Sequence, residues 1–183
     1  SSCAEKPSLP VAGSAKATDM LTLIPKDARG IFIVNFHRAM ETEAAQKAIK
    51  EDENYKKYQA FIGLTGVDPQ KDIYFIAGAM TGEIRPTEQQ GVLLLNLKYK
   101  KDAIQERIKK AETMIQEEVH NGITIYSGAG IEAKKTASGA FLDDSNIALG
   151  NKEAVKAVID TYQKKADNVL KNKELSDLIK NAN

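Results

Sequence analysis

Short stretches rich in β-branched and other apolar residues recur along the chain and predict strands. They are Gly30–Phe36, Ile73–Met80, Gly91–Leu97, Ile123–Tyr126, Ala140–Leu142 and Ile147–Leu149. In Gly91–Leu97 apolar residues occupy successive positions, which is typical of a strand buried on both faces near the centre of a sheet. The last two stretches flank a polar segment, residues 143–146, and therefore predict a hairpin.

Between these strands, apolar residues repeat every three to four positions, which is the spacing of an amphipathic helix. Helices are expected over residues 18–24, 40–49, 55–62, 101–116 and 151–162, with a last one starting near residue 172. The clearest is 101–116, where Ile104, Ile108 and Ile115 share one face. Residues 81–90 contain glycine and proline and predict a loop.

The order of these elements predicts an α+β fold, with a mostly antiparallel sheet and helices packed on one face. When Gly30 is aligned with Gly91, glycine falls on glycine, asparagine falls on asparagine, and an amphipathic helix follows each stretch. The match indicates duplicated strand–helix–strand units near residues 30–90 and 91–183. The alternative is coincidence, because a glycine before an apolar run is common.

Composition narrows the class of protein. The chain has 183 residues, 42% of them apolar and 28% charged, so a packed globular core is expected. Lys and Arg total 26 against 25 Asp and Glu, without a run of five like charges, and a nucleic-acid partner is therefore not expected. No apolar run approaches the roughly 20 residues that a membrane-spanning helix needs.

Cys3 is the chain's only cysteine, so an intrachain disulfide is excluded. The residues after it, up to Ala15, are mostly small residues and prolines, which predicts a flexible tether over residues 1–16 before a single globular domain over residues 17–183. Because the first residue is Ser rather than Met, we expect a processed or trimmed chain.

The segment Ser1-Ser2-Cys3 resembles the end of a bacterial lipobox, in which small residues precede the cysteine that receives a lipid. The resemblance implies that Cys3 is lipidated and anchors the chain to a membrane on the periplasmic side of the bacterial cell envelope. Ala4 is not the Asp that retains such proteins in the inner membrane, which favours the outer membrane. The alternative is that Cys3 is an ordinary residue of a disordered tail.

Three further segments, Leu23–Ala28, Gly66–Ile73 and Leu142–Gly150, together with the order of the elements, carry a second resemblance. They are similar to uncharacterised secreted bacterial proteins classed as domains of unknown function. The similarity spans most of residues 18–183 and implies no catalytic residues. Further units follow in such chains, which makes Asn183 a candidate truncation point.

One glycine-rich segment, Gly128–Ala133, matches the G-x-G-x-x-A form of a dinucleotide-binding motif. A working site needs these glycines to open a helix that faces the pyrophosphate. The segment instead reaches a further strand near Ser138 and includes Thr136, a poor helix former. We therefore expect a bent strand or a glycine-rich loop, and no cofactor.

The other candidate residues favour structural roles. His37 and His120 lie at element ends without the spacing of metal ligands, so they are expected at the surface. Two clusters of oxygen ligands lack the progression of a calcium loop and predict turns rather than a metal site. These clusters are Asp68 with Asp72, and Asp143 and Asp144 with Asn146. The aromatic residues Tyr55, Tyr58 and Phe61 predict core packing rather than a pocket.

No catalytic set of residues emerges from this pattern. The sequence favours a lipid-anchored, non-catalytic envelope domain that binds an unidentified protein, peptide or lipid partner. The alternative is an envelope enzyme whose site is built from dispersed carboxylates. An exposed apolar surface would favour the binding protein, whereas a deep pocket of converging titratable groups would favour the enzyme.

Overall fold

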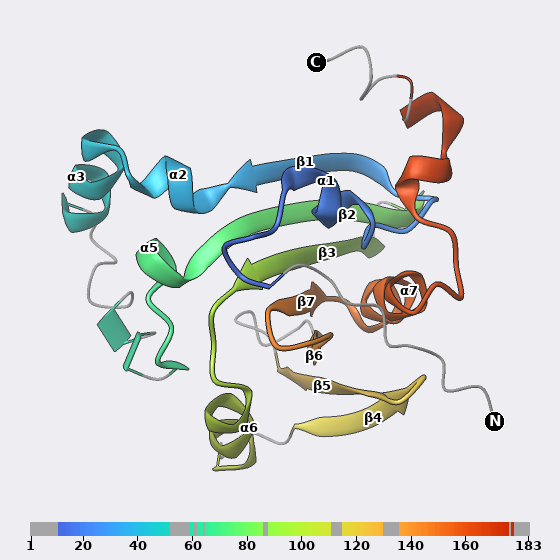
Figure 1. Ribbon diagram of the computed structural model, residues 1–183. Helices are drawn as coiled ribbons and strands as arrows, with labels where there is room; N and C mark the ends of the chain where they lie inside the picture. The colour runs from blue at the N-terminus through green and yellow to red at the C-terminus, as the bar shows by residue number, and fades with distance from the viewer. Residues whose placement is uncertain are drawn as a thin grey trace.

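The computed structural model describes residues 11–51, 59–60, 62–63, 65–85, 88–110, 115–129, 136–175 and 177. Within these ranges the chain forms one antiparallel sheet of seven strands in the order β1-β2-β3-β7-β6-β5-β4 (Figure 1). The strands are β1 (Arg29–Asn35), β2 (Ile73–Arg85), β3 (Glu88–Leu97), β4 (Gln116–His120), β5 (Ile123–Ala129), β6 (Thr136–Phe141) and β7 (Asn146–Gly150).

The sheet consists of two meanders. Strands β1, β2 and β3 pair in chain order, as do β4, β5, β6 and β7, and the pairing of β3 with β7 joins the two sets. The predicted α+β class with an antiparallel sheet is confirmed. The two stretches aligned as a repeat lie in β1, at one edge, and in β3, inside the sheet. The duplication itself stays a prediction.

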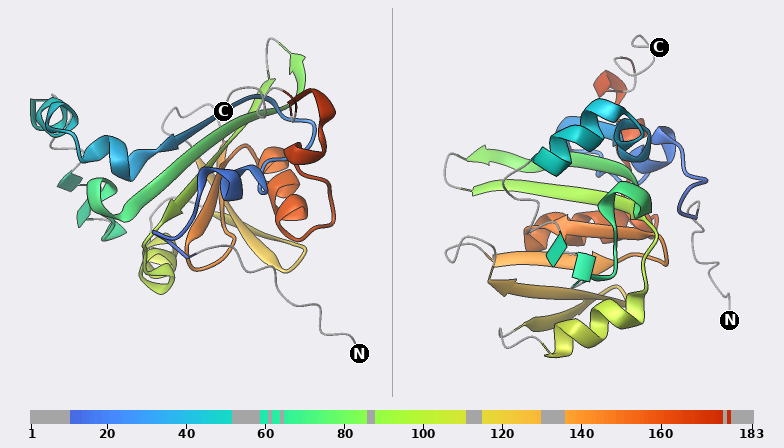
Figure 2. Two further views of the ribbon diagram at one scale, coloured as in Figure 1. Left: turned by 45° about the horizontal axis from the view of Figure 1, so that its top comes forward. Right: turned by 90° about the vertical axis from the view of Figure 1, so that its left-hand side faces the viewer.

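Helices pack on both faces of the sheet, rather than on one face as expected. The described helices are α1 (Ala17–Leu21), α2 (Phe36–Met40), α3 (Glu43–Glu51), α5 (Pro69–Asp72), α6 (Lys101–Lys110), α7 (Lys152–Tyr162) and the 3-10 helix η1 (Val169–Lys171). Helices α1 and α7 cover one face (Figure 2), whereas Ile104 and Ile108 of α6 pack against residues of the opposite face. This arrangement arises because β3 carries apolar side chains on both sides and needs cover on each.

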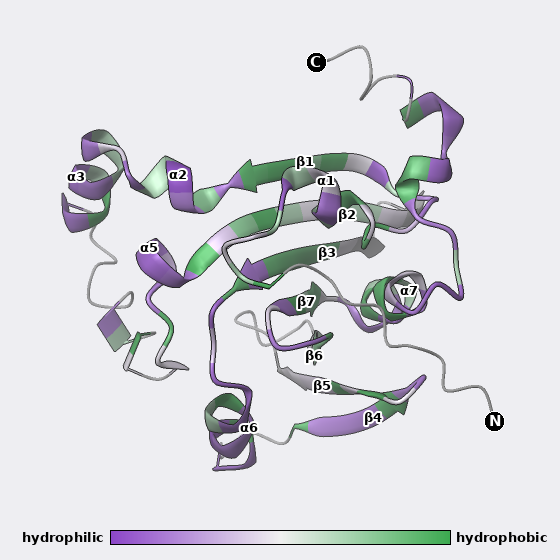
Figure 3. Ribbon diagram, viewed as in Figure 1, coloured by the Kyte–Doolittle hydropathy of each residue, from purple (hydrophilic) through white to green (hydrophobic). Residues whose placement is uncertain are grey.

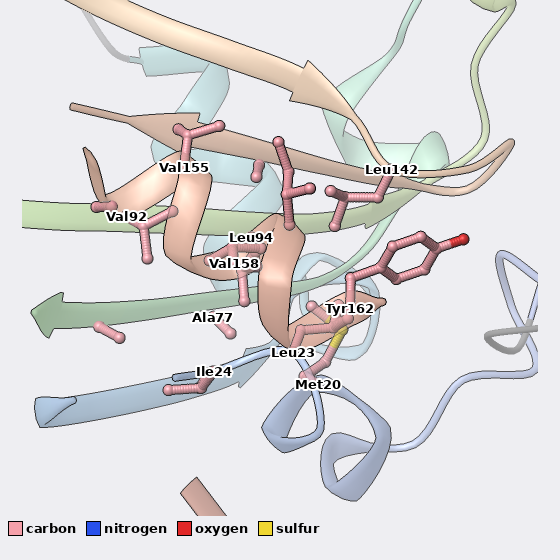
Figure 4. Packing of buried hydrophobic residues seen from close by; sticks show 14 of the residues in the cluster. Met20, Leu23, Ile24, Ala77, Val92, Leu94, Leu142, Val155, Val158 and Tyr162 are labelled. Atoms are coloured by element: carbon pink, nitrogen blue, oxygen red, sulfur yellow. The ribbon is translucent and has the colours of Figure 1, made fainter. Parts of the chain in front are cut away.

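The main core lies between α1, α7 and one face of the sheet (Figure 4). Val155, Val158 and Ile159 of α7 are fully buried there against strand residues that include Ala77 and Leu94. Helix α7 begins as predicted, because the Asn151 side chain accepts a hydrogen bond of 2.8 Å from the Ala154 N–H. The expected helix at residues 55–62 falls largely outside the described residues.

Two segments form strands that the sequence did not predict. Of the expected helix 101–116, Lys101–Lys110 is helical, residues 111–114 lie outside the described residues, and Gln116 already belongs to β4. This strand pairs with β5 through a tight turn at Asn121 and Gly122, whose φ angles of 50° and 79° are both positive. Residues 81–85 and 88–90, expected as part of a loop, instead belong to β2 and β3, with Thr81 paired to Gln90.

The end of the predicted tether contacts the domain. The Ala12 N–H donates a hydrogen bond of 3.0 Å to Ser145 Oγ in the β6–β7 loop, and Ala15 packs against the main core. Gly13 lies so close to the Tyr74 ring that a Cβ there would be 3.2 Å from it. Residues 1–10, Cys3 included, lie outside the described residues.

We predict that Gly150→Ala weakens the junction between the two meanders. A Cβ at residue 150 would lie 2.3 Å from the carbonyl oxygen of Gly91, a backbone atom that cannot move without displacing β3. We expect the variant to lose about 1–3 kcal/mol of unfolding free energy, measured by urea denaturation. Gly91→Ala is the matched control, because its Cβ would meet no atom closer than 3.8 Å. Equal stability of the two variants would contradict the prediction.

Candidate functional site

The face of the sheet opposite α1 and α7 exposes large apolar side chains. In β1, Ile31 and Ile33 turn toward the main core, so alternation sends Phe32 and Val34 to the other face. We call the exposed set on β1, β2, β3 and β7 the open face. Its members are Phe32 (51% exposed), Val34 (41%), Met80 (40%), Leu93 (43%) and Leu149 (39%). Figure 3 shows the hydrophobic residues along β1 and β3.

Cross-strand register brings these side chains together. Phe32 pairs with Gly78, Gly78 with Leu93, and Leu93 with Leu149, so the four residues form one row across the sheet. A Cβ on Gly78 would lie 2.1 Å from the Phe32 ring, which shows that the ring lies directly over the glycine. The absence of a side chain at residue 78 therefore lets the aromatic ring rest against the sheet.

A groove of about 200 Å³ continues the open face toward α6. One wall is formed by Ile104 and Ile108 of α6, and the floor by strands β3, β5, β6 and β7. Thr65, Val67 and Ile73 complete the lining, whose strand residues are Leu95, Leu97, Tyr126, Gly139, Ala140, Phe141, Ile147 and Leu149. Leu149 belongs to both surfaces, so the groove and the open face are continuous.

Among the described residues that line the groove, no hydrogen-bonding side chain is free. Thr65 Oγ1 accepts a hydrogen bond of 3.1 Å from the Val67 N–H. The Tyr126 hydroxyl accepts one of 2.8 Å from Gln105 Nε2. These are the polar side chains among the lining residues, and both are engaged. The groove therefore suits an apolar ligand.

Aromatic rings gather around Phe141 in one part of the groove lining, which we call the aromatic end. Phe141 stacks on Tyr99 at 5.6 Å between ring centroids and meets Tyr126 edge-on at 5.9 Å. The Tyr99 hydroxyl donates a hydrogen bond to the Asp143 carbonyl oxygen, and burial raises the pKa of this tyrosine. Lys101 Nζ lies 5.9 Å from the centroid of the Phe141 ring. A cation therefore stands beside the apolar lining.

Of the acidic residues singled out in the sequence, Asp143 forms a turn as predicted, whereas Asp68 caps the short helix α5 and Asp72 is the last residue of that helix. Asp143 Oδ1 accepts hydrogen bonds of 2.8 Å from the N–H groups of Ser145 and Asn146. Asp68 Oδ1 accepts one of 3.1 Å from the Gln70 N–H, and Asp72 Oδ2 accepts one of 2.7 Å from the Asp68 N–H. Within the described ranges, no three His, Cys, Asp or Glu side chains come together as a metal site.

The two histidines make different contacts. His37 stacks on Tyr74 at 4.9 Å between ring centroids. His120, expected at the surface, is half-buried, and its Nε2 lies 2.7 Å from Asp160 Oδ1 on α7. Asp160 also accepts a hydrogen bond of 2.6 Å from Asn121 Nδ2. This cluster attaches the tip of the β4–β5 hairpin to α7, which explains why His120 is not fully exposed.

Several other candidates have structural positions or fall outside the described residues. Gly128 lies in β5 and pairs with Ala137 of β6, so no helix opens at this glycine and the geometry of a dinucleotide site is not formed there. Residues 130–133 of the same motif lie outside the described residues, as do Tyr55, Tyr58 and Phe61.

The strongly shifted acids lie in ion pairs away from the groove. Glu118 accepts hydrogen bonds from Lys156 and Lys152, at N–O distances of 2.7 and 3.0 Å, and the two lysines lower its pKa to about 2. Asp167 pairs with Lys171 and Lys26, which lower its pKa as well. Acids held ionised in this way are poor general acids or bases near neutral pH. In the part of the chain that the structure describes, no acidic residue lines the groove.

Known proteins were compared with the chain by sequence and by structure. No family model and no curated protein matches it. A solved structure, crystal form IV of TP0453, is similar over 91% of this chain and 57% of that one. The TM-score is 0.46 and the sequence identity 12%, so the similarity says nothing of the site or its ligand. No described helix is long and apolar enough to cross a membrane.

We predict that Glu118 contributes a pH-dependent part of the stability. Its folded-state pKa, about 2, lies below the ordinary value of 4.5, so the contribution is present above pH 4.5 and is lost as the pH falls toward 2. Urea unfolding between about pH 5 and about pH 2 should show a smaller loss of stability for Glu118→Gln than for the wild type. Glu117→Gln, on the neighbouring residue of β4, should behave as the wild type. A Glu118→Gln profile parallel to that of the wild type would refute this contribution.

Proposed function

We propose that the chain is a non-catalytic binding domain of the bacterial cell envelope, anchored by a lipid on Cys3, whose open face binds an apolar partner. The observation that carries the proposal is the open face itself. Five large apolar side chains, each about 40% exposed or more, lie on four neighbouring strands and continue into an apolar groove. Contiguous apolar surfaces of this kind are typical of binding sites.

The arrangement of charges supports binding rather than catalysis. A hollow of about 780 Å³ beside α7 contains Asp160 and Asp167. Asp160 is held by His120 and Asn121, and Asp167 by two lysines, so both carboxylates act as structural anchors. No observation within the described residues favours an enzyme of dispersed carboxylates over a binding domain.

The anchor follows from the sequence around Cys3. A diacylated cysteine carries enough buried methylene groups, at about 0.8 kcal/mol each, to hold a domain on a membrane. Seven residues lie between Cys3 and Val11, the first described residue, so the eight steps from one to the other could span up to about 26 Å when extended. The domain would thus stay within reach of the membrane surface.

The anchor is tested by expressing the chain with its native leader in bacteria fed labelled palmitate. We expect the wild type to incorporate the label and to partition into the detergent phase, and Cys3→Ser to do neither, because the lipid needs the thiol. Val119→Ser, a surface change in β4, serves as the control. Labelling of the Cys3→Ser chain would exclude lipid attachment at this residue.

The open face is tested with a solvatochromic dye, 1-anilinonaphthalene-8-sulfonate, and the folded Cys3→Ser chain, which carries no lipid. Phe32→Asp should lower the dye fluorescence about twofold or more at an unchanged melting temperature, because a charge replaces the most exposed ring of the face. Val119→Asp is the matched control, since Val119 is 68% exposed but lies outside the open face. Fluorescence of the parent Cys3→Ser chain no higher than that of its Phe32→Asp variant would count against the binding face.

A further inference from the structure

We propose that the groove beside α6 binds the hydrocarbon tail of a long-chain fatty acid whose carboxylate lies at Lys101. This inference rests on the proposed function and names the ligand class for one part of the apolar surface. It is carried by the chemistry of the lining, by the size of the groove and by the charge at its end.

The lining favours a hydrocarbon over a peptide. Strands β3, β5, β6 and β7 each have a neighbour on both sides, so their backbone groups already pair within the sheet. The hydroxyls of Thr65 and Tyr126 are engaged as well. A peptide bound here would leave its own N–H and C=O groups without partners, which is unfavourable in a buried site. A hydrocarbon tail has no such groups.

The size of the groove favours one narrow chain. Its volume of about 200 Å³ is below the roughly 300–1,000 Å³ of most small-molecule sites. Two tails of a phospholipid would need more space. A single acyl tail is long and thin, and its further length can lie along the open face, which Leu149 joins to the groove.

The charge at the aromatic end favours an anionic head group. Lys101 Nζ lies 5.9 Å from the ring of Phe141, which lines the groove. Among the described residues, Lys101 forms no ion pair. Asp102 and Asp144 line a neighbouring hollow with it but do not pair with it, and Glu106 is bonded to Lys110 at 2.7 Å.

The surrounding segment adds to this positive charge. Lys98–Lys110 carries six basic and two acidic side chains, a net charge of +4 in a chain whose total is +1. An anionic head group would therefore be attracted to this end of the groove and find an ammonium there without a carboxylate partner. A fatty acid combines this head group with the single tail that the groove accommodates.

The tail is tested with the Cys3→Ser chain and the fluorescent fatty acid 11-(dansylamino)undecanoic acid. We expect saturable binding at one site, displaced by palmitate. Ile108→Asp should weaken binding about tenfold or more, because it places a charge in the wall of the groove. Leu149→Asp, at an exposed position of the rim, tests the same point with less risk to folding. Val119→Asp should bind as the parent chain does.

The head group is tested by competition between dodecanoate and dodecanol. For the parent chain, dodecanoate should displace the probe at about tenfold lower concentration than dodecanol, because only the acid pairs with Lys101. In Lys101→Gln this preference should fall to about twofold or less, whereas Lys109→Gln, an exposed residue of the same helix, should keep it. An unchanged preference in Lys101→Gln would overturn the assignment of the head-group site.

Other occupants give different results. If the lipidated wild type fails to bind the probe that the Cys3→Ser chain binds, the groove holds the chain's own acyl group, and the assignment to a free fatty acid is overturned. If the chain forms a dimer that Ile108→Asp converts to a monomer, a second copy of the chain occupies the groove. This result would also overturn the assignment to a free fatty acid. A chain that binds the anilinonaphthalene dye through Phe32 but not the fatty acid would refute this inference alone. A chain that binds neither would refute the proposed function too.

Discussion

The structure depends on the pairing of β3 with β7, the two strands that join the meanders and carry apolar side chains on both faces. Leu94 and Ala148 point into the main core, and their neighbours Leu93 and Leu149 point the other way. Each of these two apolar faces therefore needs other elements packed against it. Helices α1 and α7 cover the first, whereas α6 and the residues around Val67 cover only part of the second. The groove and the open face are the parts of the second face that these residues leave uncovered.

A buried polar pair fixes the register at this junction. Asn96 and Asn146 are opposite each other in β3 and β7, and Asn96 Nδ2 donates a hydrogen bond of 3.0 Å to Asn146 Oδ1. Asn146 in turn donates to the carboxylate of Asp143 in the adjoining loop. A shift by one residue would bury these amides without partners, which is costly in a core. The same register aligns Leu93 with Leu149 and so builds the apolar row.

The sequence predicted most strands and the fold class because alternation and β-branched residues reflect local packing. It missed β4, because Gln116, Glu117 and Glu118 are all polar and lack the alternation that predicts a strand, and Gln116 was placed in the helix 101–116. Their strand conformation depends on pairing with β5 and on the lysines of α7. It also placed all helices on one face, because the pattern of β3 does not say which helix covers which side.

The candidate site was beyond motif analysis, because ordinary apolar residues from many elements compose it. One signal was present: Phe32 and Val34 are apolar at positions where a half-exposed edge strand is normally polar. An unbroken apolar stretch predicts burial on both faces, yet β1 lies at an edge and its second face is exposed. The apolar pattern thus indicated a surface that should pack against another element. Only the structure shows that α6 packs against part of that surface. A ligand with an apolar body would bury the rest of this surface. It would need no hydrogen bonds from the sheet, whose strands cannot provide them.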